Sequence, residues 1–288
     1  MKSLMFESCA IVGIGETRYG RLPGVSLLGM HLEAAKKAIE DAGLTNRDVD
    51  GLLVSEGDPP EHMYSCLVAE NLGIPDLKFT TPMQIAGATG AMEVVHAVAA
   101  ITAGLAETVV CIVGSKGQTG REVRKHGKIA MGGEDWEDPF GVWGAPARYA
   151  MATRRHMMEY GTTSRQLGAI AVAMRKHAGL NDNATMRTPI TIEDHQNSRW
   201  IVEPFHLLDV CLISDAAAAV VITTSEKAKS LRQPPVTIMG VGEGYGPNPR
   251  HWINKEHLTE SGAKFAGQRA FAMAGVTPAD IDVAEIYD

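Results

Sequence analysis

A short turn in front of an apolar helix is the part of this sequence best suited to chemistry. The residues Gly87-Ala88-Thr89-Gly90 predict a tight turn after a strand over Phe79 to Ile85. An apolar helix is predicted from Ala91 to Ala103, and Gly104 ends it. Backbone N–H groups at such a helix start can stabilise a developing oxyanion. The pattern is typical of a nucleophile elbow, and a simple strand–helix turn is the alternative interpretation.

A second pair of glycines lies near the N-terminus. Cys9 to Ile14 is an apolar run that predicts a buried strand, and Gly13-Ile14-Gly15 overlaps its end. The dinucleotide-binding fingerprint needs a third glycine at position 18, where this chain has Arg18. We therefore expect Gly13 and Gly15 to serve a tight turn, with no nucleotide bound there.

The cysteines and histidines form no recognisable metal or disulfide pattern. No two cysteines have the C-x-x-C spacing, and no H-E-x-x-H sequence occurs. We expect reduced thiols and no metal site. His96 is predicted to pack in the core of its apolar helix, whereas three histidines of the middle region are expected at the surface. The residues concerned are Cys9, Cys66, Cys111 and Cys211, and His156, His177 and His206.

Composition and charge exclude several classes of function. The 288 residues are 45% hydrophobic and 21% charged, as in a globular protein. A net charge of -7 argues against a general nucleic-acid-binding protein, which would present a basic face. The first residues do not resemble a signal peptide, and apolar stretches such as Ala216 to Ile222 fall short of the ~20 residues that a membrane span needs. We expect a cytoplasmic protein that binds neither nucleic acid nor membrane.

Strands and helices alternate through the first 114 residues. This alternation predicts an α/β fold with a largely parallel sheet, covered by helices on both faces. Residues 115–205 are richer in charge, methionine and glycine, and they predict a helical insertion with helices at Pro146 to Tyr160 and Ser164 to His177. The other predicted helices are Leu27 to Ala42 and Met63 to Leu72, and the other strands are Val49 to Ser55, Thr108 to Gly114, Ser214 to Thr224 and Val236 to Val241.

An internal repeat relates the two ends of the chain. Residues 38–50 read AIEDAGLTNRDVD and residues 270–282 read AFAMAGVTPADID, at a constant offset of 232 (270 − 38). Upstream, Ile11 to Gly15 resembles Ile238 to Gly242. Chance similarity of two amphipathic helices is the alternative, but helix, turn and following strand match in order. The repeat predicts two related β-α-β halves.

The repeat also predicts the domain organisation. The first half spans residues 1–114, the insertion 115–205, the last strand of the first half and a linker 206–235, and the start of the second half 236–288. By the offset, Asp288 corresponds to Glu56, so the second copy lacks counterparts of residues 57 to about 114. We expect either a natural chain longer than this sequence or a second half that is short.

Several motifs in this order resemble the thiolase superfamily, in particular its sterol-carrier-protein-associated branch, over nearly the whole chain. The helix from Gly90 to Gly104 has Ile101 at the family's spacing. The run Ser214 to Ala218 resembles the family's D-G-A-A-A strand, and DIDVAEIYD at the end resembles its D-x-x-E-x-N-E-A-F region. The resemblance implies a layered αβαβα fold of two related halves, the second incomplete.

The resemblance also implies a site without the family's nucleophile. The nucleophilic cysteine position, counted back from Gly90, falls on Gly87, which cannot form an acyl-enzyme. Cys111 is expected on the next strand, buried and inert. The family's oxyanion-hole asparagine aligns with Tyr287, whose phenol could act as acid or base, and its neighbour aligns with Asp288. An ordinary strand tyrosine and a solvated carboxylate are the alternatives for these two residues.

The glycine-rich segment from Gly240 to Gly246 lies where thiolases bring the pantetheine arm of coenzyme A past the backbone. Gly240 and Gly242 would allow that approach, and Tyr245 could line the pocket or be an ordinary loop tyrosine. The family's remaining catalytic histidine and cysteine fall beyond the last residue of this sequence. The substrate expected from the resemblance is a coenzyme A thioester, with no covalently bound cofactor.

Three functions follow from these expectations. The first is retro-aldol cleavage of a β-hydroxyacyl-CoA, from a steroid or aromatic side chain, without a cysteine nucleophile. The second is an acetyl-CoA acetyltransferase or other thiolase-type acyltransferase that uses another cysteine. The third is a non-catalytic acyl-CoA-binding subunit. By resemblance we expect a homodimer and a small partner subunit made of a zinc ribbon and an OB-fold.

Overall fold

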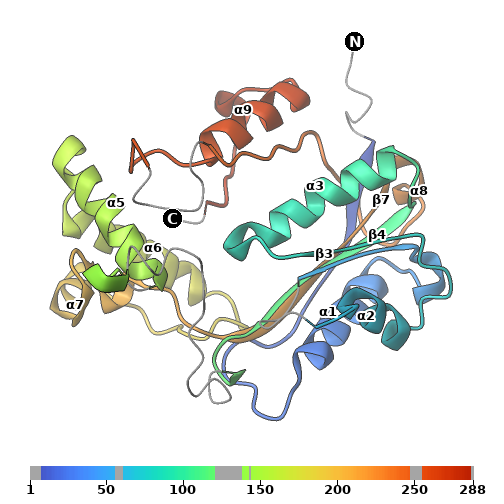
Figure 1. The fold of residues 1–288 in the computed structure, drawn as a ribbon, viewed down its shortest axis with the longest axis horizontal. Helices are drawn as coiled ribbons and strands as arrows, with labels where there is room; N and C mark the ends of the chain where they lie inside the picture. The colour runs from blue at the N-terminus through green and yellow to red at the C-terminus, as the bar shows by residue number, and fades with distance from the viewer. Residues whose placement is uncertain (1–7, 56–60, 121–137, 143, 247–254, 287–288) are drawn as a thin grey trace. The chain divides into compact units, whose positions relative to one another are not determined.

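A mixed six-stranded sheet is the framework of the larger of two units in the computed structural model (Figure 1). The structure describes residues 8–55, 61–120, 138–142, 144–246 and 255–286. The sheet unit comprises residues 1–120, 214–244 and 263–288, and the helical unit comprises residues 121–213 and 245–262.

The strands of the sheet lie in the order β3-β2-β4-β7-β1-β8. They are β1 (Cys9–Glu16), β2 (Gly51–Ser55), β3 (Phe79–Met83), β4 (Thr108–Lys116), β7 (Asp215–Thr224) and β8 (Val236–Thr237). β2 is parallel to β3 and β4, but the pairs β4–β7, β7–β1 and β1–β8 are antiparallel. The expectation of a largely parallel sheet is therefore wrong for the pairs formed by β7, β1 and β8. Short crossovers keep β2, β3 and β4 parallel, whereas the long connection before β7 leaves its direction free.

Helices cover both faces of the sheet, as the sequence predicts (Figure 1). α1 (Leu27–Asp41) and α2 (Tyr64–Leu72) pack on one face, and α3 (Thr89–Thr102) packs on the other. The Ser26 hydroxyl accepts a hydrogen bond from the Gly29 N–H at 2.9 Å and so caps the start of α1. Gly43, with a φ of +74°, ends that helix in the left-handed conformation that glycine adopts without strain.

Gly13 and Gly15 pack a helix against the sheet. Both lie inside β1, which continues to Glu16, so the expectation of a tight turn at these glycines is wrong. A Cβ on Gly13 would lie 2.3 Å from the carbonyl oxygen of Ala38, and one on Gly15 would lie 2.3 Å from that of Ala34. Only residues without a side chain allow α1 to approach β1 this closely.

The same packing recurs in the second copy of the repeat. A Cβ on Gly240 would lie 2.3 Å from the Ala270 carbonyl oxygen, and one on Gly242 would lie 2.2 Å from that of Ala266. Both carbonyls belong to α9 (Ala263–Ala274). Ala266 and Ala270 are the residues that correspond to Ala34 and Ala38 at the offset of 232. The glycine–helix contact is therefore the same in both copies of the predicted repeat.

The turn after each repeated helix is held by the same hydrogen bonds. Asp48 accepts from the Thr45 N–H at 2.8 Å and from its hydroxyl at 2.7 Å. Asp280 accepts from Thr277 at the same two distances. The copies then diverge, because residues 281–286 form no strand and β8 is shorter than the predicted Val236 to Val241.

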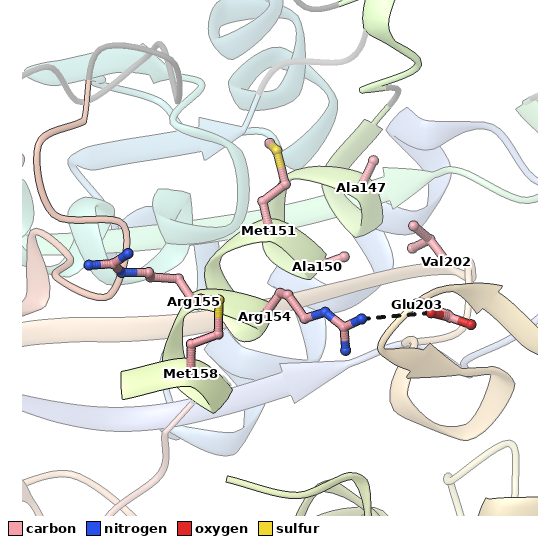
Figure 2. Close-up of a pocket in the computed structure, with 8 residues that line it drawn as sticks. All are labelled: Ala147, Ala150, Met151, Arg154, Arg155, Met158, Val202 and Glu203. Atoms are coloured by element: carbon pink, nitrogen blue, oxygen red, sulfur yellow. Dashed lines mark ion pairs between the residues drawn. The ribbon is translucent and has the colours of Figure 1, made fainter. Parts of the chain in front are cut away.

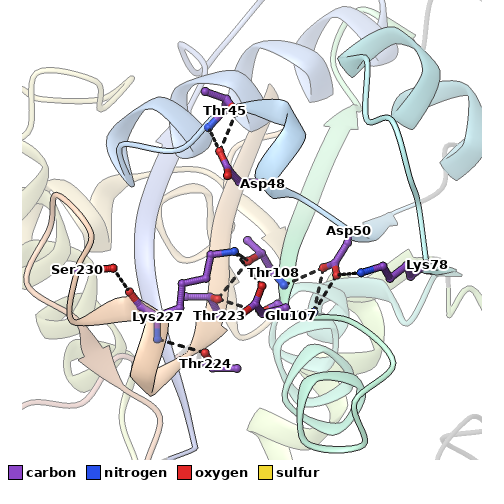
Figure 3. Close-up of polar contacts among 10 residues, drawn as sticks. All are labelled: Thr45, Asp48, Asp50, Lys78, Glu107, Thr108, Thr223, Thr224, Lys227 and Ser230. Carbon is purple, nitrogen blue, oxygen red and sulfur yellow. Dashed lines mark hydrogen bonds and ion pairs between the residues drawn. The ribbon is translucent and has the colours of Figure 1, made fainter.

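A polar network joins the strand ends that lie opposite the Gly87 turn (Figure 3). Asp50, just before β2, accepts from the Thr108 N–H at 2.8 Å and pairs with Lys78 at 3.2 Å. Lys227 donates to the Thr108 hydroxyl at 2.8 Å, and that hydroxyl lies 3.1 Å from the Thr223 hydroxyl. The network links β2, β4 and β7 at one end of the sheet. The Gly87 turn lies at the other end, where the parallel strands finish.

The helical unit contains the two helices predicted for the middle region. They are α5 (Gly144–Tyr160) and α6 (Ser164–Ala178), followed by α7 (Ile192–Asn197) and a hairpin of β5 (Trp200–Val202) and β6 (Phe205–His206). His195 is fully buried and lies 2.6 Å from Asp209, which also accepts from the His206 N–H at 2.7 Å. His206 is buried, so its predicted place at the surface is wrong. Within the described ranges, no helix is long and apolar enough to cross a membrane.

Candidate functional site

The Gly87 turn joins β3 to α3 at the carboxyl end of the parallel strands. A single 3-10 turn, Ala86–Ala88, leads directly into α3. Ala86 has a φ of +46°, a left-handed conformation that costs free energy for a residue with a Cβ. Such strain persists only where the surroundings fix the backbone, and it is enriched at functional turns.

Thr89 fixes this turn. Its buried hydroxyl donates to the Ala86 carbonyl at 2.7 Å and accepts from the Ile85 N–H at 2.9 Å. The Thr89 side chain therefore pairs with the N–H of the residue before Ala86 and with the carbonyl of Ala86 itself. The backbone of the turn is held by the protein before any ligand arrives.

Gly87 is exposed and has open space where a side chain would be. A Cβ built on it meets no heavy atom within 4 Å, and its φ is not in the left-handed region. Gly90 differs, because its Cβ would lie 3.1 Å from the Val113 side chain. The turn thus has room for a reacting group but no nucleophile of its own, and its Ala88 and Thr89 N–H groups donate to the carbonyls of Ile85 and Ala86.

Cys111 does not replace the missing nucleophile. It lies on β4 and is 3% exposed, as expected from the sequence. Burial raises the pKa of its thiol well above the usual value, and the nearby Glu93 carboxyl raises it further. The reactive form of cysteine is the thiolate, which this environment disfavours.

Glu93 is a buried acid that sequence reasoning missed. It lies on α3 one turn after Thr89, is fully buried, and neither carboxyl oxygen has a hydrogen-bond partner of ordinary geometry among the described residues. Burial raises its pKa to about 8, which the main chain of Ile112 offsets only in part. The side chain is therefore protonated at neutral pH. The signal in the sequence was a lone acidic residue inside an apolar helical stretch.

The segment after β8 carries the predicted substrate-pocket residues. Gly240 and Gly242 pack closely against α9. The sequence predicted a different reason for these glycines, namely the close approach of a pantetheine arm. Tyr245 is 48% exposed on the loop that follows. Tyr287 and Asp288, the predicted catalytic pair, lie outside the described residues.

His96 is not the packed core histidine that the sequence predicts. Its side chain is 42% exposed, and its Nε2 lies 3.0 Å from a carboxylate oxygen of Glu243. His96 is three residues after buried Glu93, so the two residues are neighbours on α3, and His96 lies at the margin of the buried face. No spacing in the sequence links residues 96 and 243, so only the fold reveals this pair.

Asp215, in the Ser214 to Ala218 motif, connects three segments near the end of β4. Its buried carboxylate accepts from the N–H groups of Leu22 at 3.0 Å, Gln118 at 2.9 Å and Thr119 at 3.1 Å. The Thr119 hydroxyl donates at 2.7 Å. Burial alone would raise the pKa of Asp215, but these hydrogen bonds outweigh it and lower the pKa. The motif thus has a structural role that its sequence did not reveal.

A groove of about 350 Å³ lies in the helical unit between α5 and β5 (Figure 2). Arg154 pairs across it with Glu203 at 3.9 Å, and the Ala150 and Met151 side chains form part of its lining. None of the predicted site residues within the described part of the chain lines this groove. Among the described residues, no group of histidine, cysteine, aspartate or glutamate side chains is arranged to hold a metal ion.

Comparison with known proteins places the chain in a family. Residues 244–288 match the family described as thiolase C-terminal domain-like. A steroid side-chain-cleaving aldolase of Thermomonospora curvata is 39% identical, over 99% of this chain and 75% of its own length. A 17-hydroxy-3-oxo-4-pregnene-20-carboxyl-CoA lyase of Mycobacterium tuberculosis is 37% identical, over 99% of this chain and 76% of its own length.

A solved structure agrees with these relatives. The Ltp2-ChsH2(DUF35) aldolase superposes with a TM-score of 0.88 at 39% identity, over 97% of this chain and 72% of that chain. The layered α/β fold predicted from the sequence is therefore confirmed. This chain belongs to the thiolase superfamily, in the branch of the sterol carrier protein 2-like thiolases and the Ltp2-like aldolases.

Proposed function

We propose that this protein is an acyl-CoA lyase that cleaves a carbon–carbon bond of a β-hydroxyacyl-CoA by a retro-aldol step. The observation that carries the proposal is the Gly87 turn, which keeps a helix-start geometry but has no nucleophile. A retro-aldol cleavage needs none. Relatives at 39% and 37% identity are a steroid side-chain-cleaving aldolase and a CoA-thioester lyase, which supports the same reaction class and a steroid side chain as the acyl group.

The proposed cleavage needs no covalent bond between enzyme and substrate. A base removes the proton of the β-hydroxyl group, and the bond between Cα and Cβ breaks. The β-carbon leaves as a ketone or aldehyde, while the electron pair moves into the thioester as an enolate. A proton added at Cα then gives the shortened acyl-CoA. Main-chain N–H groups of the Gly87 turn would stabilise the enolate oxygen.

One tyrosine and one aspartate at the end of the sequence are the proposed proton-transfer groups. Tyr287 and Asp288 are proposed as the catalytic pair because they occupy the family's oxyanion-hole asparagine position and its neighbour. Tyr245 is proposed to line the substrate pocket, with the backbone at Gly240 and Gly242 beside the pantetheine arm. The exposure of Tyr245 leaves its phenol accessible to such a ligand.

The reaction can be tested directly. The protein, alone and after iodoacetamide treatment, is incubated with β-hydroxyacyl-CoA thioesters that carry steroid or aromatic side chains, and products are followed by chromatography. We expect a shortened acyl-CoA whose formation resists alkylation and is lost in Tyr287→Phe. Loss of activity on alkylation would instead indicate a cysteine-dependent acyltransferase. Binding of the thioesters without any product would indicate a carrier subunit.

A gain-of-nucleophile variant tests the role assigned to the turn. Gly87→Cys adds a thiol where a Cβ meets no other atom. We expect this thiol alone to become newly alkylated and to form a thioester with acetyl-CoA, detected as a mass shift on the peptide that contains position 87. Cys111, buried in both proteins, is the internal control. A Gly87→Cys thiol that forms no acyl adduct would contradict the assignment.

We also propose a homodimer and a second kind of subunit. β3 pairs with β2 only among the described strands, so one of its edges is open for a second copy. The name of the Ltp2-ChsH2(DUF35) aldolase joins two components, which supports a ChsH2(DUF35)-like partner here. The partner is the small zinc-ribbon and OB-fold subunit expected from the resemblance.

A further inference from the structure

We propose that Glu243 is a positioning residue that holds the segment leading to Tyr245 between two helices. This inference rests on the proposed function only in giving Tyr245 a role at the substrate. Glu243 lies six residues after the end of β8, close to Gly244, where the chain leaves the sheet unit for the helical unit. Its side chain and its main chain contact different helices.

The side-chain contact is with α3. The Glu243 carboxylate lies 3.0 Å from Nε2 of His96, and the two side chains are 29% and 42% exposed. The pair is an ion pair when the imidazole carries a proton. α3 is also the helix that begins at the Gly87 turn, and His96 is seven residues beyond Thr89, about 10 Å along the helix. Glu243 is thus tied to the same rigid element as the turn.

The main-chain contact is with α9. The Arg269 guanidinium donates to the carbonyl oxygen of Glu243. Upstream, the Val241 N–H donates to the Met273 sulfur at 3.5 Å, and Gly240 and Gly242 are pressed against the α9 backbone. Ile238 and Val241 also pack on the apolar cluster that contains Ala97 and Val98 of α3. The segment is therefore held from both sides up to Glu243.

The chain passes from the sheet unit to the helical unit directly after Gly244. Tyr245 follows, and its Cα can lie no more than about 7 Å from that of Glu243 because two residues reach no further. Gly246, with a φ of +68°, comes next. Glu243 is thus the residue nearest before Tyr245 for which contacts with both α3 and α9 are seen, and the main chain reaches Tyr245 from it through Gly244 alone.

A half-exposed ion pair contributes little to global stability, so its loss should alter catalysis more than folding. Small displacements of a substrate-positioning group lower the turnover rate steeply. For Glu243→Gln we expect kcat to fall about tenfold or more, with KM changed much less and the melting temperature unchanged. Hydrogen exchange of the amides in residues 238–246 should become faster.

The test compares five proteins in steady-state assays and in hydrogen exchange measured by mass spectrometry. They are the wild type, Glu243→Gln, His96→Gln, the double variant, and His96→Lys, which places a cation opposite Glu243. The matched control is Glu33→Gln, which removes another exposed carboxylate, paired with Lys37 at 2.7 Å on α1. We expect equal, non-additive losses in the first two variants and recovery in His96→Lys.

The outcomes separate this inference from the proposed function. No lyase activity in the wild type would overturn the proposed function, and hydrogen exchange in residues 238–246 would still test the positioning. Unchanged kcat and unchanged exchange in Glu243→Gln would overturn the positioning role of Glu243 while leaving the lyase proposal intact. Additive effects of the two single variants would overturn the coupling between His96 and Glu243.

Discussion

At the scale of single residues, two buried titratable side chains make stability depend on pH in opposite directions. Neither carboxyl oxygen of buried Glu93 has a hydrogen-bond partner of ordinary geometry among the described residues, and the same holds for Nε2 of His31, which is fully buried on α1. The other nitrogen of His31 lies 2.8 Å from the Tyr64 hydroxyl. Burial raises the pKa of Glu93 to about 8 and lowers that of His31 to about 4. Both side chains are therefore neutral in the folded protein near pH 7.

Glu93→Gln should stabilise the protein at alkaline pH. The folded pKa of Glu93 lies above its unfolded value of 4.5, so its favourable contribution is present below pH 4.5 and is lost as the pH rises through 8. We expect the variant to gain about 4 kcal/mol in the free energy of unfolding at pH 8 and nothing at pH 4.5. Urea unfolding at both pH values measures this. An equal gain at both would contradict a titrating Glu93.

His31 should make the protein sensitive to acid. Its folded pKa lies below the usual 6.5, so the unfolded chain takes up a proton first and stability falls between pH 6.5 and about 4. We expect a loss of about 3 kcal/mol across this range, and a shallower pH dependence in His31→Gln. Tyr64→Phe is the control, because it removes the hydrogen bond to His31 without removing the titrating group. Parallel curves for His31→Gln and wild type would exclude His31 as the cause.

At the scale of elements, two glycines differ in the space around them. Gly242 is enclosed by a packed helix, and Gly87 faces open space at the proposed site. A Cβ on Gly242 would lie 2.2 Å from the Ala266 carbonyl, whereas one on Gly87 would touch nothing. The first glycine lets α9 approach the segment after β8. The second leaves space at the start of α3, so the two positions make a matched pair.

Gly242→Ala should therefore destabilise the protein, and Gly87→Ala should not. The overpacked helix contact in Gly242→Ala should cost about 1–3 kcal/mol, because α9 must move away. Thermal unfolding should show a lower melting temperature for Gly242→Ala and no change for Gly87→Ala. Equal melting temperatures of the two variants would mean that α9 is not held by this contact.

At the scale of the whole molecule, the open edge of β3 is the proposed place of dimer formation. Pro82, which has no N–H to donate, lies on β3, as is usual for an edge strand. Thr81→Lys would bring like charges together if two copies of β3 meet there. We expect this variant to sediment as a monomer and the wild type as a dimer. Val236→Lys, on β8 at the opposite edge of the sheet, is the matched control and should remain dimeric.

The sequence by itself determined the local elements and the relation between the two halves. Runs such as Thr108 to Gly114 are apolar without interruption, and helix stops such as Gly43 are conformational requirements of the backbone, so both can be predicted locally. The repeat at 38–50 and 270–282 was also visible, because a turn held by Thr45 and Asp48 needs the same residue types in each copy. The Gly87 turn could also be predicted, because its glycines and the apolar helix after it are local features of the sequence.

Only the tertiary structure decided the features that depend on distant residues. The direction of β7 depends on its neighbours β4 and β1, which lie far away in the sequence. The packing role of Gly13 and Gly15 depends on α1 approaching within van der Waals distance. The pairing of His96 with Glu243 and the burial of Glu93 likewise arise when α3 settles between the sheet and the segment after β8. Local sequence propensities cannot predict such contacts, because the contacts form only when segments that are distant in the sequence come together in the fold.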